Sequence, residues 1–372
     1  MPEPPRKPRR KALFDTDRIL AFAVGKPSEA FGDRYRVFDS GRVIARLPGP
    51  PYQFLDRIVG IEGCEPWKLA PGGTVEAEYD VPPDAWYFAA NRSRTMPFCV
   101  LLEAALQPCG WLAAYVGSAL ASPTDLCFRN LGGSGVKLAE VAAGTGALTT
   151  RVKMTSVSQS SGMIIQHFDL DVRSDEGPVY QGTTYFGFFT RAALAEQVGL
   201  RDAKRWAPAL PARGEAFAYP TEAPFPSSEL RMVSRIDSWL PAGGPAGLGF
   251  VRGTKPVDPS EWFFKAHFYQ DPVQPGSLGI EAFLQALKLA LARRWGAPAG
   301  AEISAPVPGT RHEWIYRGQV VPTHREVTVE AAVTEIDGNR RTLKADGYLL
   351  ADGLPIYDLR GFCAAPAAPW VP

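Results

Sequence analysis

The chain has 372 residues, and its 40 lysines and arginines nearly balance its 39 aspartates and glutamates, so the formal charge at pH 7 is +1. This balance argues against nucleic acid as the main partner, because nucleic-acid-binding proteins usually carry a strong positive field. Five scattered cysteines without CxxC spacing argue against a disulfide framework or a zinc site, and they fit a reducing cytoplasm. We expect no membrane insertion, because no apolar run approaches ~18 residues, and the basic, proline-rich N-terminus predicts no signal peptide.

The N-terminal region predicts a tail followed by a short helix and a strand. Residues 1–13 are rich in proline and basic side chains and are expected to be disordered. A short helix is predicted within residues 15–31, where apolar residues end at a Gly-Lys-Pro step. The alternating segment TVEAEY, residues 74–79, predicts a strand.

A long apolar helix is predicted over residues 99–119, with a lone carboxylate, Glu103, near its start. Burying such a group is costly unless it is paired or performs chemistry. Pro108 lies inside this helix and predicts a kink or a break after Gln107, because proline lacks the backbone N–H. Residues 127–189 follow with alternating runs separated by turns, and they predict antiparallel strands.

A proline-rich stretch at residues 196–228 has little periodicity and is predicted to link two units, residues 14–195 and 229–372. The second unit repeats the plan of strands around one long helix. Its strands are predicted at residues 232–239, 248–255, 314–321, 327–336, 342–350 and 356–362. A mostly antiparallel sheet with one long helix against it is an α+β architecture.

Two segments of the chain, residues 86–107 and 262–285, align with each other. The matched pairs are Trp86 and Trp262, Pro97 and Pro275, Glu103 and Glu281, and Gln107 and Gln285. One difference stands out, because the second copy has His267 where the first has Asn91. The alignment predicts an internal duplication in which only one copy kept the titratable group.

The second copy, HFYQDPVQPGSLGIEAFLQ, resembles the active-site segment of hot-dog-fold β-hydroxyacyl-ACP dehydratases. The matching residues are His267, Phe268, Asp271, Pro272, Val273, Pro275, Gly276 and Glu281. The segment departs at Tyr269-Gln270, where Pro-Gly is common, and at Gln274, where methionine is common. The later YRGQVVP, residues 316–322, resembles the strand motif that follows the helix in this family.

The duplicated form, with Asn91 in the first copy, resembles the dehydratase domains of polyunsaturated fatty acid synthases. This resemblance covers most of residues 15–365. It implies a double hot dog, with two antiparallel sheets that each wrap around a long central helix.

Dehydration of a 3-hydroxyacyl thioester removes an α-proton and protonates a leaving hydroxide. A histidine suits the first task because its ordinary pKa is near neutrality, and a carboxyl in an apolar helix suits the second because burial raises its pKa. The helix start at Pro275-Gly276 offers free N–H groups to the thioester carbonyl. We expect no metal or redox cofactor.

In the dimers of the family, the histidine and the acid come from opposite hot dogs. The resemblance therefore implies that His267 works with Glu103, and Gln107 lies one helical turn away to hold that carboxyl. Asn91 and Glu281 would then form a degenerate second site. The competing assignment pairs His267 with Glu281 of its own unit, and the sequence leaves this alternative open.

The resemblance implies dehydration of 3-hydroxyacyl thioesters to trans-2-enoyl thioesters in polyunsaturated fatty acid synthesis. The substrate would be carried on the phosphopantetheine of an acyl carrier protein, and other synthase domains would be partners, with the chain a monomeric double hot dog or a homodimer of it. Isomerisation of the new double bond stays open. The alternatives are a hot-dog acyl thioesterase and a non-catalytic acyl-binding module.

Overall fold

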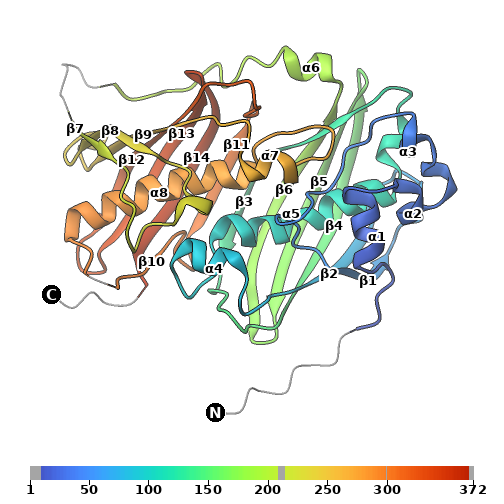
Figure 1. Cartoon of the computed structure of the whole chain (residues 1–372), viewed down its shortest axis with the longest axis horizontal. Coiled ribbons are helices and arrows are strands. Elements are labelled where there is room, and N and C mark those ends of the chain that lie inside the picture. The colour runs from blue at the N-terminus through green and yellow to red at the C-terminus, as the bar shows by residue number, and fades with distance from the viewer. Residues whose placement is uncertain (1–9, 208–213, 299, 368–372) are drawn as a thin grey trace.

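The computed structural model describes residues 10–207, 214–298 and 300–367. Its strands form one antiparallel sheet in the order β1-β2-β4-β5-β6-β3-β11-β14-β13-β12-β9-β8-β7, with β10 paired to β14 (Figure 1). The first half contains β1 (Arg57–Glu62), β2 (Thr74–Asp80), β3 (Cys127–Lys137), β4 (Ala147–Ser160), β5 (Met163–Ser174) and β6 (Gly177–Phe189). The second half contains β7 (Glu215–Ala218), β8 (Arg235–Leu240), β9 (Phe250–Pro256), β10 (Ile303–Ser304), β11 (Arg311–Tyr316), β12 (Glu326–Asp337), β13 (Thr342–Ala351) and β14 (Leu354–Pro366).

The two halves join edge to edge through β3 and β11. In this pairing Val136 lies opposite Arg311 and Gly132 lies opposite Ile315. The two predicted antiparallel sheets are therefore present as the halves of one continuous sheet. The α+β double hot dog expected from the sequence is confirmed.

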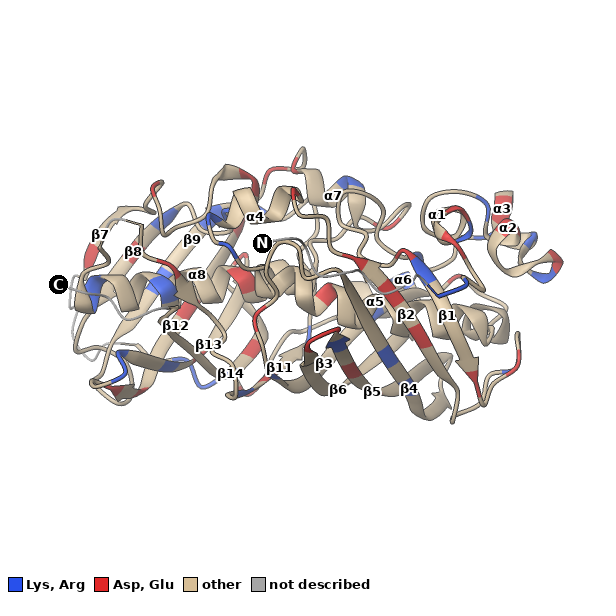
Figure 2. Ribbon diagram, turned by 90° about the horizontal axis from the view of Figure 1, so that it is seen from below, with Lys and Arg blue, Asp and Glu red and all other residues tan. Residues whose placement is uncertain are grey.

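Each half carries one long helix on the same face of the sheet. The helices are α1 (Thr16–Ala23), α2 (Pro27–Phe31), α3 (Val37–Ser40), α4 (Trp86–Asn91), α5 (Phe98–Tyr115), α6 (Arg191–Ala195), α7 (Trp262–Ala266) and α8 (Gly276–Trp295). The long helices α5 and α8 start beside each other at the middle of the molecule and run in opposite directions (Figures 1 and 2). Figure 2 also shows Lys and Arg interspersed with Asp and Glu along the ribbon.

Of the kink or break predicted after Gln107, the break is wrong, because α5 is continuous from Phe98 to Tyr115. Pro108 cannot donate to the carbonyl of Ala104, four residues earlier. The Thr150 hydroxyl of β4 donates to that carbonyl instead, at 3.2 Å. A side chain from the sheet therefore supplies the hydrogen bond that the proline removes.

The expectation that no apolar run approaches the length of a membrane span also needs correction. By length and composition, α5 is long and apolar enough to cross a bilayer. In the fold this helix is buried along nearly its whole length against the sheet. In the sequence, the polar residues Glu103 and Gln107 interrupt the apolar run, so it looks shorter than the helix. In the fold, both side chains are buried with the rest of the helix.

The helix predicted within residues 15–31 appears as two, α1 and α2. Asp15 caps α1, and its carboxylate accepts from the N–H of Arg18 at 3.1 Å. The second helix begins at a proline, whose fixed φ suits a first helical position.

The predicted tail, residues 1–13, lies largely outside the described residues, because the description starts at residue 10. Within the described part, Arg10 forms ion pairs with Glu76 and Glu78 of β2, each at 2.6 Å. These two glutamates lie two apart on one strand, so their side chains share one face and attract a cation. Arg10 is therefore fixed on the sheet, in contrast to the expectation.

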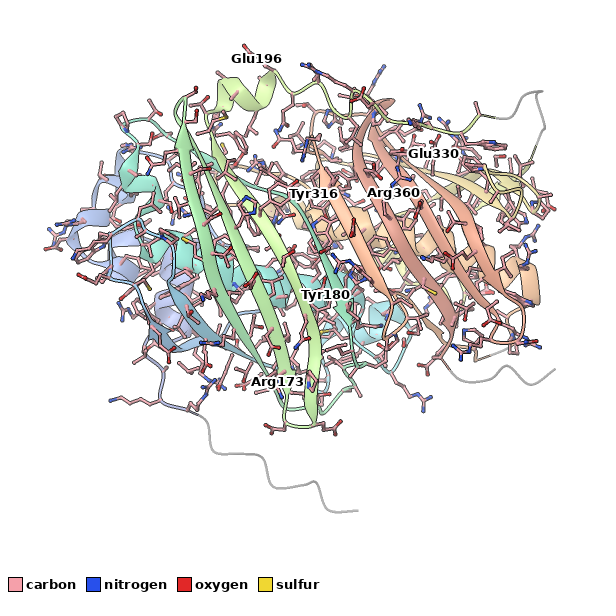
Figure 3. All side chains as sticks on the ribbon, turned by 180° about the vertical axis from the view of Figure 1, so that it is seen from behind. Arg173, Tyr180, Glu196, Tyr316, Glu330 and Arg360 are labelled. Atoms are coloured by element: carbon pink, nitrogen blue, oxygen red, sulfur yellow. The ribbon has the colours of Figure 1, made fainter. Side chains whose placement is uncertain are left out.

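In the predicted linker, residues 196–207 run along the upper edge of the second half (Figure 3), whereas the hydroxyl of Tyr219 donates to the carbonyl of Gln285, so the later part lies on the side of α8. Residues 208–213 are outside the described part. Arg205 binds both carboxylate oxygens of Glu330, at 2.6 and 2.9 Å, so the segment is held against β12. It also includes the edge strand β7. The domain boundaries themselves stay predictions.

Candidate active site

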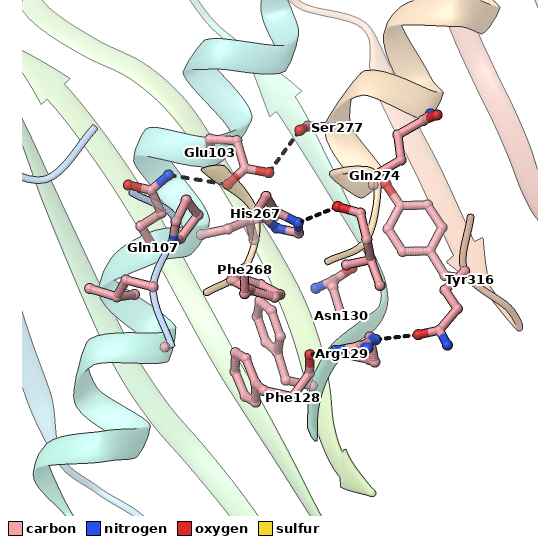
Figure 4. A pocket seen from close by; sticks show the side chains of 18 of the residues that line it. Glu103, Gln107, Phe128, Arg129, Asn130, His267, Phe268, Gln274, Ser277 and Tyr316 are labelled. Carbon is pink, nitrogen blue, oxygen red and sulfur yellow. Dashed lines mark hydrogen bonds between the residues drawn. The ribbon is translucent and has the colours of Figure 1, made fainter. Parts of the chain in front are cut away.

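A cavity that is open to solvent lies at the junction of the two halves, next to the starts of α5 and α8 (Figure 4), and its empty space is about 710 Å³ when the open mouth is included. We refer to it as the central cavity. Side chains from both halves line it, including Arg46, Leu47, Glu103, Gln107, Gly110, Phe128, Arg129, His267, Gly276, Ser277, Tyr316 and Gln319. It therefore collects residues that are far apart in the sequence.

His267 lies just after α7, in the loop that leads to α8. Its Nδ1 is 3.0 Å from the carbonyl oxygen of Val273. Because a carbonyl can only accept, Nδ1 carries the proton, and Nε2 keeps a free lone pair. Burial lowers the pKa of His267 to about 3. The ring is therefore neutral at pH 7 and has the form required of a general base.

An ion pair across the halves holds the histidine loop. Asp271 accepts from both terminal nitrogens of Arg129 on β3, at 2.7 and 2.9 Å. Burial alone would raise the pKa of Asp271, but hydrogen bonds and charge from Arg129 outweigh this and lower it. Sequence reasoning missed Arg129, which lies 142 residues before Asp271 and belongs to no motif.

Glu103 lies in the second turn of α5 and is only 6% exposed. One carboxylate oxygen accepts from Ser277 Oγ at 2.7 Å, and the other accepts from Gln107 Nε2 at 3.2 Å (Figure 4). Burial raises the pKa of Glu103 to about 7, although both hydrogen bonds act in the opposite direction. A large fraction of this carboxyl is therefore protonated near neutral pH, as a general acid requires.

Gln107 is itself fixed by the backbone. Its Oε1 accepts from the N–H of Phe54 at 2.7 Å, and its Nε2 donates to the carbonyl of Tyr52 at 2.9 Å. The predicted supporting residue is thus one helical turn from Glu103 and is anchored to the segment before β1. Because Gln107 is anchored in this way, its Nε2 is held in position to donate to Glu103.

At the start of α8, Gly276 leaves room for Tyr316. A Cβ at position 276 would lie 2.6 Å from the ring of Tyr316, which no side chain tolerates. The hydroxyl of Tyr316 is buried and has no hydrogen-bond partner among the described residues. The first N–H groups of a helix also have no partner within the helix. The cavity therefore has two kinds of unused donor at the same end.

The central cavity brings His267 of the second half together with Glu103 of the first, and Gln107 and Gly276 line it as well. Glu281 is not among the described residues that line it. The geometry favours the pairing of His267 with Glu103 over its pairing with Glu281. The assignment of these residues to catalysis stays a prediction.

The other buried glutamate has different surroundings. Glu281 is fully buried, accepts from Gln285 at 3.1 Å and lies 3.7 Å from the ammonium of Lys288. Its second oxygen has no hydrogen-bond partner among the described residues. Asn91, which replaces the histidine here, donates to the carbonyl of Thr95.

Phe98 fills the space at the start of α5. It stands at the position that Gly276 occupies in the second copy, and its ring packs edge-on against His312 at 5.0 Å. Phe98 also contacts the rings of Tyr180 and Phe362. The helix start is therefore packed with aromatic side chains where the other copy has a cavity.

Within residues 10–207, 214–298 and 300–367, no group of three or more His, Cys, Asp or Glu side chains is placed to hold a metal ion. The expectation that no cofactor is needed stays a prediction.

One continuous antiparallel sheet with two buried helices and a shared cavity defines a double hot dog. A family model described as the FabA-like domain matches the chain twice, over residues 47–183 and 225–360. The chain therefore belongs to the FabA-like domain family and contains two copies of the domain.

A subunit of the polyunsaturated fatty acid synthase of Thraustochytrium sp. is 31% identical to this chain over 384 residues. The match covers 92% of this chain and 25% of that protein, so the chain spans about a quarter of the length of this curated relative. This relative is part of the kind of synthase to which the duplicated sequence was expected to be similar.

Solved structures with similar folds include enzymes of two kinds. A protein of Lactobacillus plantarum assigned as an oleoyl thioesterase aligns with a TM-score of 0.48 and 8% identity, over 80% of this chain and 98% of its own. A bifunctional dehydratase-cyclase domain in ambruticin biosynthesis aligns with a TM-score of 0.41 and 17% identity, over 85% of this chain and 95% of its own.

Proposed function

We propose that the chain dehydrates 3-hydroxyacyl thioesters to trans-2-enoyl thioesters in the synthesis of polyunsaturated fatty acids. The observation that carries this proposal is the pair of groups in the central cavity, a neutral histidine and a buried carboxyl of raised pKa. A base and an acid whose pKa values are shifted apart are what a β-elimination needs. The similarity to part of a polyunsaturated fatty acid synthase supports the same substrate class.

In the proposed reaction, Nε2 of His267 removes a proton from the carbon next to the thioester carbonyl. The electron pair of that C–H bond forms the new double bond as the C–O bond to the hydroxyl breaks. Glu103 gives its proton to the departing hydroxide, which leaves as water. The histidinium then returns a proton to the glutamate through solvent, so both groups regain their starting forms.

The thioester carbonyl acquires negative charge as the α-proton leaves. The hydroxyl of Tyr316 and the first N–H groups of α8 are placed at one end of the cavity to receive that charge. Such preorganised donors are typically worth about 10²–10³ in rate. Gly276 is required at this point, because any larger residue would displace the Tyr316 ring.

The acyl chain has a path along α5. Gly110 lies two helical turns after Glu103, about 10 Å along the axis. A Cβ there would lie 3.2 Å from Leu47 and 3.4 Å from Phe128, so the glycine keeps a narrow passage open. A small hollow with room for about one water molecule also adjoins Gly110 and reaches Phe22 of α1.

We further propose that an acyl carrier protein delivers the substrate on its phosphopantetheine arm, within a larger synthase. The relative is four times longer than the segment it shares with this chain, which leaves room for carrier and other domains in that protein. The thioester in the proposed reaction would be the bond between the acyl group and this arm.

The test is to incubate the protein with a 3-hydroxyacyl pantetheine thioester and to analyse the thioester by mass spectrometry. We expect loss of one water from the thioester, with no free acid. Release of free acid would replace the proposal with a thioesterase, and an unchanged thioester that binds without reaction would replace it with an acyl-binding module. The His267→Ala variant is the control for uncatalysed loss of water.

A further inference from the structure

A chain of buried hydrogen bonds reaches Glu103 from the other half of the molecule. Ser277, the second residue of α8, donates from Oγ to a carboxylate oxygen of Glu103 at 2.7 Å. The hydroxyl of Tyr52, which precedes β1, lies 3.0 Å from the same Oγ. Ser277 is 2% exposed and Tyr52 is fully buried, so water does not compete for these bonds.

The direction of the two bonds follows from the protons available. A serine hydroxyl has a single proton, and Ser277 donates it to Glu103 when this carboxyl is ionised. In that state Tyr52 donates to Ser277. Burial raises the pKa of Tyr52 well above its ordinary value, so this phenol keeps its proton. The result is an ordered relay from Tyr52 through Ser277 to Glu103.

The second buried glutamate lacks this relay. Cys99 occupies the position in α5 that Ser277 occupies in α8, since both follow the aligned prolines by two residues. A thiol is only a weak donor. Consistent with this, one oxygen of Glu281 has no hydrogen-bond partner among the described residues. The glutamine that binds each carboxylate is present in both copies and does not distinguish them, whereas the Ser277 hydroxyl binds Glu103 and has no counterpart beside Glu281.

We infer that Tyr52 and Ser277 are positioning residues that hold Glu103 in its catalytic orientation. This inference rests on the proposed function of Glu103 as the general acid. Ser277 and Gln107 each bind one carboxylate oxygen, and together they fix the rotation of the carboxyl group toward the cavity. Ser277 comes from α8 and Gln107 from α5, so the relative placement of the two halves sets the position of the acid.

The first test compares Ser277→Ala with Ser118→Ala, which also removes a fully buried hydroxyl but at a residue that does not line the central cavity. We expect Ser277→Ala to lower kcat by about 10- to 100-fold with little change in KM, because a misplaced catalytic group loses rate rather than binding. Ser118→Ala should leave kcat unchanged, and Ser277→Thr, which keeps the hydroxyl, should recover most of the loss. Equal losses in the two alanine variants would show a packing effect and overturn the inference.

The second test is a double-mutant cycle between Tyr52→Phe and Ser277→Ala. Tyr52 acts only through Ser277 in the relay, so Tyr52→Phe should reduce kcat in the parent chain and have no further effect in the Ser277→Ala background. Additive losses would contradict the relay. If Ser277→Ala fails to fold, Tyr52→Phe still tests the relay, because it removes only one hydroxyl. A normal kcat in this variant would then overturn the relay.

A third measurement does not depend on turnover and so separates this inference from the proposed function. The titration of Glu103 can be followed by NMR in protein with ¹³C-labelled glutamate carboxyls, and the signal is assigned with Glu103→Gln. Ser277 favours the ionised form, so Ser277→Ala should raise the midpoint above that of the parent, while Ser118→Ala should not.

The titratable groups that face Glu103 are His267, Tyr52, Tyr316 and Cys99. Burial lowers the pKa of His267 and raises the pKa values of the other three, so all four stay uncharged from pH 5 to 9 as the titration is run. A midpoint that does not move in Ser277→Ala would overturn the relay, whatever the activity of the parent chain. A moved midpoint in a chain without dehydratase activity would keep the relay and reject the proposed function.

Discussion

Two glutamates stand at matching positions of two matching helices, and only one of them faces a cavity. Glu103 has both oxygens bonded and lines the space that contains His267. Glu281 is fully buried beside Lys288, with one oxygen unpartnered among the described residues. In both halves the glutamate is followed one turn later by a glutamine, whose amide donates to a backbone carbonyl of the segment before the next strand.

The difference between the halves comes from a few side chains placed on a common scaffold. In the first helix, Phe98 fills the space that Gly276 leaves open in the second. Lys288 likewise stands where the first helix has Gly110, the residue beside the proposed acyl path. A duplicated fold can thus keep one site and fill the other without changing its backbone plan.

The most direct way to break the comparison is to give the second half the residue of the first. His267→Asn should lower the rate of dehydration by about 10²–10⁴, the usual contribution of a general base. Its circular dichroism should match the parent, because the residue lies in a loop. Steady-state kinetics with a 3-hydroxyacyl pantetheine measures the loss. Asn91→Ala, at the matching position, should keep the parent rate, and a similar loss there would contradict the asymmetry.

The pH profile of kcat/KM should report Glu103 and His267 alone. The reaction needs Glu103 protonated, and its pKa is about 7, so the rate should fall about tenfold per pH unit above that value. It needs His267 neutral, and the pKa of this residue is about 3, so the rate should be level between pH 5 and 6.5. A decline below pH 6.5 with the fold intact would show that His267 titrates like an exposed histidine.

The proposed acyl path can be blocked by a large side chain at Gly110, because the matching position of the second helix carries the large residue Lys288. Gly110→Leu should place a side chain against Leu47 and Phe128, and it should lower kcat/KM for long acyl chains by at least about tenfold. Short substrates that end before this point should react at the parent rate. Kinetics across a series of chain lengths measures the effect, and equal losses for short and long chains would place the acyl group elsewhere.

The two long helices also differ in their backbone hydrogen bonds, because α5 contains a proline and α8 does not. Thr150→Val should lower the free energy of unfolding by about 1–3 kcal/mol, because it leaves the Ala104 carbonyl buried without a donor. Chemical denaturation measures the loss. Adding Pro108→Ala restores a helical N–H to that carbonyl and should recover part of the stability. No recovery would mean that Thr150 acts by packing alone.

Much of the fold is readable from local pattern. In β5, for example, buried and exposed residues alternate, and this alternation is what the sequence shows over the same residues. The continuity of α5 was not readable, because the hydrogen bond from Thr150 that compensates Pro108 spans 46 residues. The attachment of Arg10 to β2 was missed for the same reason, since its partners lie 66 and 68 residues away.

The residues of the candidate site also fall into two groups, those that the sequence pointed to and those that it did not. His267, Gly276 and the two glutamates sit in a contiguous motif and its repeat, so a family resemblance could point to them. The groups that hold them were missed, because Ser277 reaches Glu103 across 174 residues and Arg129 reaches Asp271 across 142. Such pairs depend on how the halves join through β3 and β11, and no spacing in the sequence encodes that contact.

The central claim is that His267 works with the glutamate of the opposite half. The measurement that tests it most directly is the turnover of Glu103→Gln beside that of Glu281→Gln, two equal changes at matching helix positions. We predict that Glu103→Gln lowers kcat by about 10²–10⁴, since an amide cannot supply the proton, and that Glu281→Gln remains close to the parent. A dead Glu281→Gln enzyme with an active Glu103→Gln enzyme would contradict the account and pair His267 with its own half.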